Sequence, residues 1–159
     1  MHTFLKTLIV GAMFAVVTPS LAADKPAADA AVGTWNLNLA KSKFTPGPAP
    51  KSQIRTYLET PQGLALTIKT VGADGKESLA QSTFKYDGKD YPFTGSPNFD
   101  AIAVKRVNGN TVSSTQKQGG KVVGSTKRVI SKDGKVMTLS SKGTSAKGPY
   151  EIVSVYDRQ

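Results

Sequence analysis

The chain has 159 residues, a formal net charge of +10 and no cysteine, and its only histidine is His2. The missing cysteine excludes disulfide bonds and thiol catalysis. In any mature form that begins after His2, Ser-His, Cys-His and histidine-ligated metal or haem sites are excluded as well.

Residues 1–22 have the pattern of a secretory signal peptide, in which His2 and Lys6 precede an apolar run from Leu8 to Val17 and a short segment ending at Ala22. An uncleaved anchor is the alternative, but the run is shorter than the roughly 20 residues of a membrane-spanning helix. We therefore expect a periplasmic or extracellular protein with no transmembrane segment after cleavage. Residues 23–31 are small and polar and predict a flexible lead-in to one domain over residues 32–159.

Turn signals divide this domain into short β-prone runs. Asp-Gly, Asn-Gly and Gly-Gly pairs supply the positive φ angles of tight hairpins, and they occur at 74–75, 87–88, 108–109, 119–120 and 133–134. The proline-rich link Lys41–Pro50 predicts an extended loop. The alternation of apolar residues, such as Ile54 with Leu58, predicts strands at 33–38, 52–59, 64–71, 76–86, 89–94, 101–107, 111–118, 121–131, 135–142 and 149–157.

Consecutive hairpins with short links make each strand pair with its neighbour in sequence. We therefore predict an all-β fold, an antiparallel up-and-down β-barrel of about 8–10 strands. The alternative is a two-sheet β-sandwich. Polar residues stand beside the apolar ones on several strands and either face solvent or line a wettable interior: Ser113, Thr115, Ser125, Thr138, Ser140 and Ser154.

Ten Lys and Arg residues but only one acid lie between Lys105 and Lys147. In each of the Lys-Arg pairs at 105–106 and 127–128, adjacent side chains point to opposite faces of the strand. An inward arginine needs an anionic partner, because burying an unpaired charge is unfavourable by several kcal/mol. That partner is either the head group of a ligand or a closing salt bridge, for example with Glu151 or Asp157.

The acidic residues form no catalytic or metal-binding motif. Five of the acids belong to turn pairs or to the lead-in. The other six have no recognisable spacing and are interpreted as surface charges: Glu59, Glu77, Asp90, Asp100, Glu151 and Asp157. The sequence also contains no glycine-rich phosphate motif. We expect no catalytic residue, no metal, no cofactor and no enzyme activity.

The opening Val32-Gly33-Thr34-Trp35 resembles that of lipocalins and fatty-acid-binding proteins, in which a Gly-x-Trp start places the indole across one end of the barrel. Lys132–Leu139 and Val153–Asp157 resemble the last strands of the fatty-acid-binding branch. Other phrases are similar to secreted bacterial lipocalin-like proteins of no assigned activity: Ala40–Phe44, Pro46–Pro48 and Tyr86–Pro92. The resemblance covers nearly all of residues 32–159 and implies a calycin barrel.

The sequence departs from the carboxylate clamp of the fatty-acid-binding branch. Tyr156 matches the clamp tyrosine, but Ser154 stands where the arginine would be. Arg128 lies one residue too far from the Asp133-Gly134 turn to match the second arginine, and one residue reverses the face of a strand side chain. Lys41–Pro50 is also too short for the two-helix lid of that branch.

Two hypotheses follow. The first is a carrier or sensor of a small hydrophobic or amphipathic, anionic ligand, with site residues Trp35, Phe84, Tyr86, Ile102, Val104, Tyr156, and Arg106 or Arg128 at the head group. The second is a structural or interaction module with a packed interior, whose basic face contacts the anionic cell envelope. Nucleic acid is not expected, because the basic segment 105–147 has no aromatic residue to stack on bases. An interior void of roughly 300 Å3 or more, lined by an arginine, would favour the carrier.

Overall fold

The computed structural model describes residues 28–159, so the predicted signal peptide lies outside the described residues. The part described consists of β-strands and one turn of 3₁₀ helix (η1). The elements are β1 (Gly33–Leu37), η1 (Leu39–Lys41), β2 (Lys43–Thr45), β3 (Ser52–Thr60), β4 (Gly63–Val71), β5 (Glu77–Phe84), β6 (Asp87–Thr94), β7 (Ala101–Arg106), β8 (Thr111–Gln118), β9 (Lys121–Ile130), β10 (Val136–Ser145) and β11 (Gly148–Arg158).

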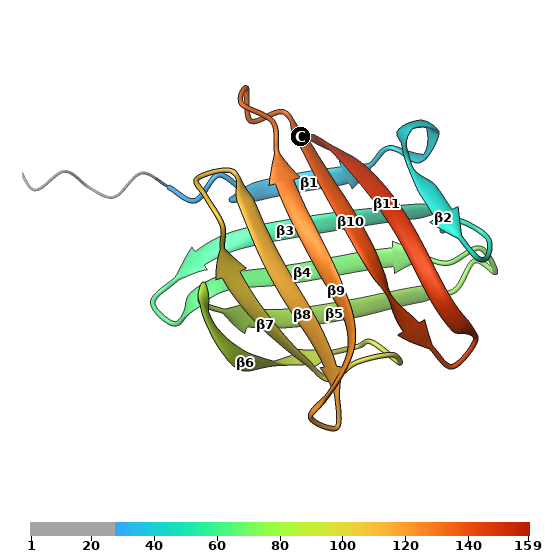
Figure 1. The fold of residues 1–159 in the computed structure, drawn as a ribbon. Helices are drawn as coiled ribbons and strands as arrows, with labels where there is room; N and C mark the ends of the chain where they lie inside the picture. Colours follow the sequence, from blue (N-terminus) through green and yellow to red (C-terminus); the bar gives the residue numbers. More distant parts are fainter. Residues whose placement is uncertain (1–27) are drawn as a thin grey trace, which may run out of the picture.

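The strands form one closed antiparallel barrel (Figure 1). From β3 to β11 each strand pairs with the next in sequence, and β1 pairs with β3. The barrel is closed by β1 and β11, which pair from Trp35–Arg158 to Leu37–Tyr156. Because β1 and β11, the first and last strands of the chain, pair with each other, the predicted up-and-down barrel is confirmed and the β-sandwich alternative is wrong. In Figure 1, β3, β4 and β5 pass behind β8–β11 at a steep angle.

The prediction of an extended loop over Lys41–Pro50 is wrong at its start. Within it, β2 pairs with β11 and extends the sheet beyond the closing pair. The Ser42 hydroxyl accepts a hydrogen bond of 2.9 Å from the backbone N–H of Val155, which ties the link to β11. Prolines begin only at Pro46, so residues 43–45 retain the N–H groups that strand pairing requires.

The β5–β6 hairpin is centred on Asp87-Gly88, as predicted, because Gln81 pairs with Thr94 and Ser82 with Phe93. These two residues begin β6, where Asp87 pairs with Lys105 of β7 and the register shifts before Asp90. Gly88 has a φ of 75°. A glycine with positive φ at a register shift is typical of a β-bulge, so the turn pair also bends the start of β6 where it pairs with β7.

Residues 29–32 lie against one end of the barrel and are held there by the fold. Ala31 and Trp35 are completely buried, and Trp35 Nε1 donates a hydrogen bond of 2.7 Å to the Ala31 carbonyl. The Arg158 guanidinium lies 4.2 Å from the centre of the Trp35 ring system and donates to the Val32 carbonyl at 2.6 Å. Residues 29–31, the last part of the predicted lead-in, therefore make tertiary contacts with the barrel although their side chains are small.

Gly95, between β6 and β7, provides a test of this architecture. Its φ is 78°, and a Cβ atom there would lie 1.9 Å from the Leu79 carbonyl oxygen. We expect Gly95→Ala to lower the free energy of unfolding by roughly 2 kcal/mol, because strained backbone and a backbone clash coincide. Urea unfolding measures this change. Gly109→Ala is the control, since a Cβ at Gly109 would meet nothing within 4 Å; equal stability of both variants would contradict the prediction.

Candidate ligand-binding cavity

The barrel encloses a cavity of about 450 Å3. Strands β3 to β11 all contribute inward-facing side chains to it. Over β4–β7 its wall is apolar and consists of Leu66, Ile68, Phe84, Phe93, Ile102 and Val104. This volume exceeds the roughly 300 Å3 at which small-molecule sites typically begin.

Arg55 on β3 brings a positive charge to the cavity wall. Its Nε donates to Gln53 Oε1 at 3.3 Å, and its guanidinium carbon lies 5.3 Å from the centre of the Tyr156 ring. Within residues 28–159, no ion pair joins Arg55 to an acidic side chain. The cavity therefore has a half-buried cation whose partners are an amide and an aromatic ring.

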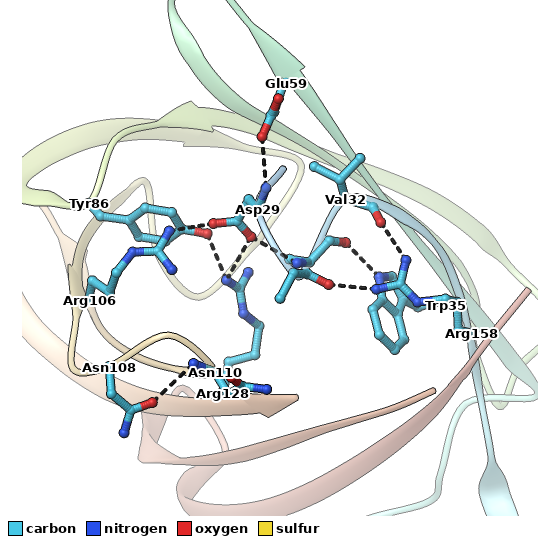
Figure 2. Close-up of polar contacts among 12 residues, drawn as sticks. Asp29, Val32, Trp35, Glu59, Tyr86, Arg106, Asn108, Asn110, Arg128 and Arg158 are labelled. Atoms are coloured by element: carbon cyan, nitrogen blue, oxygen red, sulfur yellow. Dashed lines mark hydrogen bonds and ion pairs between the residues drawn. The ribbon is translucent and has the colours of Figure 1, made fainter. Parts of the chain in front are cut away.

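Arg128 on β9 also faces inward, but it has an internal counterion. Only 6% of its side chain is exposed, and its Nη2 lies 3.8 Å from a carboxylate oxygen of Asp29. The same nitrogen donates a hydrogen bond of 2.7 Å to the Tyr86 hydroxyl. Figure 2 shows the Asp29 carboxylate between Arg128 and Arg106, whose guanidinium donates to the other carboxylate oxygen.

Asp29 is therefore the anionic partner that an inward-facing arginine on the basic strands requires. The suggestion of Glu151 or Asp157 for this role is wrong, because Asp157 pairs with Lys41 and Glu151 lies exposed on β11. Residues 29–32 carry Asp29 to the barrel end, where its backbone N–H donates to Glu59 at 2.8 Å. A segment interpreted from sequence as a lead-in therefore supplies a buried carboxylate.

The two inward arginines, Arg55 and Arg128, make the interior electrostatically positive. Burial by itself raises the pKa of Tyr57, but Arg55 and Arg128 outweigh burial and hold that pKa below its ordinary value of 10.0. For Tyr86, burial prevails over the influence of Arg128 and raises the pKa to about 12. The tyrosine that faces both arginines therefore experiences a potential that favours negative charge in the cavity.

A second polar group of residues lies on β8–β10. Gln116 Nε2 donates to Thr126 Oγ1 at 2.8 Å, and the hydroxyl oxygens of Thr126 and Ser141 are 2.8 Å apart. All three residues line the cavity. Ser113 and Ser140 instead face solvent, so the polar interior comes from their strand neighbours.

Four of the residues predicted for the site line the cavity: Phe84, Ile102, Val104 and Arg128. The other four lie outside its lining: Trp35, Tyr86, Arg106 and Tyr156. Trp35 is buried beneath Arg158 at the barrel end. Tyr86 contacts Arg128 and Tyr156 contacts Arg55, so these two tyrosines position the cavity arginines and are left out of the proposed site.

Sequence reasoning misses Gln53, Arg55 and Tyr57. Because Ile54 and Leu58 are apolar, the face of β3 that carries them is expected to be buried. In the structure, 40% of Ile54 and 57% of Leu58 are exposed. The signal that could have found the site is the spacing Gln-x-Arg-x-Tyr, which puts three long polar side chains on one face of a strand.

Residues 28–159 contain no group of three or more acidic or histidine side chains placed to hold a metal ion. In the same part of the chain, no helix has the length and apolar character needed to cross a membrane.

A closed antiparallel meander around an internal cavity defines a lipocalin-like β-barrel. No family model and no curated protein matches the chain. Among solved structures, the chain is similar to zebrafish ileal bile acid-binding protein complexed with cholic acid, at 11% identity over 82% of this chain and 99% of that chain, with a TM-score of 0.49. The fold assignment rests on the strand pairing of the chain itself.

Proposed function

We propose that this chain is an exported, non-enzymatic carrier that binds a small amphipathic, anionic ligand inside the barrel. The observation that carries the proposal is the guanidinium of Arg55. It lines a cavity of about 450 Å3 and has no acidic partner among residues 28–159. A carboxylate or a similar anionic head group would give it charge-assisted hydrogen bonds.

The rest of the cavity suits the apolar body of such a ligand. The wall over β4–β7 is built from aliphatic and aromatic side chains, among them Ile68, Phe84 and Ile102. Burial of apolar surface there supplies affinity, while Arg55 fixes the orientation of the head group. Arg128 already has Asp29 as its counterion, so it contributes mainly to the positive potential.

The alternative function, an interaction module with a packed interior, requires side chains to fill the barrel. A cavity lined by Arg55 and Arg128 does not support that requirement. We therefore favour the carrier, and the pattern of residues 1–22 supports a periplasmic or extracellular location for it.

Native mass spectrometry of the full-length gene product, purified from the periplasmic fraction of its expression host, tests the proposal. We expect a mature chain beginning after Ala22 that retains a small molecule, which organic solvent releases. A protein that retains no added mass, and that binds no anionic amphiphile after it has been delipidated, would contradict the carrier function.

A further inference from the structure

Only one of the two polar atoms of the Gln116 side-chain amide is hydrogen-bonded within the described residues. Its side chain lines the cavity and is 7% exposed, and its Nε2 donates to Thr126 Oγ1. Its Oε1 is buried and has no hydrogen-bond partner among the described residues. Because buried polar atoms in native proteins are nearly always paired, this oxygen points to a group that the chain itself does not supply.

The hydroxyl of Tyr150 lies beside this amide. A Cβ atom at Gly124 would lie 2.6 Å from Tyr150 Oη and 3.1 Å from Gln116 Oε1, so the two oxygens lie close together beside Gly124. The absence of side chains at Gly124 and at its cross-strand neighbour Gly143 lets the Tyr150 hydroxyl pack against their backbone, since a Cβ at Gly143 would lie 2.8 Å from the same hydroxyl. Tyr150 also lines the cavity.

The two side chains offer complementary chemistry. Gln116 Oε1 is a hydrogen-bond acceptor, and the Tyr150 hydroxyl can donate. Burial raises the pKa of Tyr150, which keeps its proton in place at neutral pH. Neither group carries a charge, so the pair differs in kind from the arginine region of the cavity.

The strand register places this pair far from Arg128. On β8, Val112 is opposite Arg128, and Gln116 is opposite Gly124. Gln116 therefore lies four residues along the strand from the level of Arg128, which is roughly 13 Å at the rise of an extended strand. The turns at this end of the barrel follow β8 and β10, whereas residues 29–32 cover the other end.

We propose that Gln116 and Tyr150 form a second, uncharged subsite that binds a hydroxyl group on the apolar body of the ligand. This inference rests on the proposed carrier function and narrows the ligand class to hydroxylated amphipathic anions. One hydroxyl group donates to Gln116 Oε1 and accepts from Tyr150 Oη. An unsubstituted hydrocarbon end would leave both protein groups without partners.

Calorimetric titration of the delipidated mature protein with decanoate and ω-hydroxydecanoate tests the subsite. We measure the preference for ω-hydroxydecanoate over decanoate as the ratio of their dissociation constants. We expect this preference to be about tenfold larger in the wild type than in Gln116→Met, because the variant lacks one buried hydrogen bond to the ligand. Tyr150→Phe is also expected to reduce the preference for ω-hydroxydecanoate over decanoate. Gln81→Met is the matched control on the exposed face of β5, and it keeps the wild-type ratio.

The possible outcomes distinguish failure of the subsite from failure of the proposed carrier function. If decanoate binds but the ratio is the same in wild type, Gln116→Met and Tyr150→Phe, the subsite is overturned and the carrier function stands. If no saturated carboxylate from octanoate to hexadecanoate binds, and no hydroxylated form does, both are overturned. Unfolding midpoints close to that of the wild type show that each variant is folded when it is titrated.

Discussion

Replacing Asp29 with alanine is expected to lower the free energy of unfolding by about 3 kcal/mol, because it leaves the buried Arg128 guanidinium without a counterion. The Arg128 side chain is 6% exposed and that of Asp29 is 9% exposed, so water replaces the carboxylate poorly. Arg106, the third member of the cluster, is 40% exposed and tolerates the loss better. Urea unfolding followed by tryptophan fluorescence measures the change, since Trp35 is the only tryptophan.

The double variant Asp29→Ala/Arg128→Met separates charge from packing. If the penalty arises from an unpaired buried cation, removing that cation restores much of the lost stability. Glu77→Ala is the control, because Glu77 lies exposed on β5 and joins no ion pair within residues 28–159, and we expect no measurable effect. A single variant as stable as the wild type would show that residues 29–32 do not anchor the barrel end.

The same carboxylate has a defined dependence on pH. Burial by itself raises the pKa of Asp29, but the Ala31 backbone N–H, Arg106, Tyr86 and Arg128 together hold it below the ordinary value of 3.8. A depressed folded-state pKa means that the contribution is complete above the unfolded-state value and is lost as pH falls through the folded-state value. The stability difference between wild type and Asp29→Asn should therefore be constant near neutral pH and shrink below about pH 4.

Replacing Arg55 with methionine is expected to weaken binding of an anionic amphiphile such as decanoate about 100-fold, because the variant lacks the charge that meets the head group. Stability should not fall, since Arg55 has no acidic partner in residues 28–159 and its removal leaves no carboxylate unpaired. Calorimetry and thermal unfolding measure the two effects on the same sample.

Two further variants make this result specific. Lys69→Met removes one positive charge from the exposed face of β4, and we expect unchanged affinity. Arg55→Lys keeps the charge but not the planar donor pair, so an intermediate loss of affinity is expected. Equal binding by wild type and Arg55→Met would refute Arg55 as the head-group residue.

Local signals account for most of the fold that could be predicted. Turn pairs such as Asn108-Gly109 and Asp133-Gly134 separate strands that pair in sequence order, and a run of short hairpins restricts the topology to few forms. The failures occurred where a distant strand decided the outcome. Residues 43–45 of the predicted extended loop form β2, because β11, the last strand of the chain, pairs with them.

The candidate site was predicted less well than the fold. The alternation on β3 places Ile54 and Leu58 on one face and Arg55 on the other, but it does not determine which face points into the barrel. Apolar residues are the usual choice for the interior. This barrel instead turns Arg55 inward, where Tyr156 from the far end of the chain packs on it.

The sequence by itself determined a cysteine-free β meander long enough to close, with no histidine after His2, because these properties depend on composition and on contacts between neighbouring strands. Only the tertiary structure decided which arginine is neutralised and which is left for a ligand. The reason is physical: the state of a buried charge depends on the groups that surround it in space. Asp29 reaches Arg128 across almost a hundred residues, whereas no carboxylate in residues 28–159 pairs with Arg55.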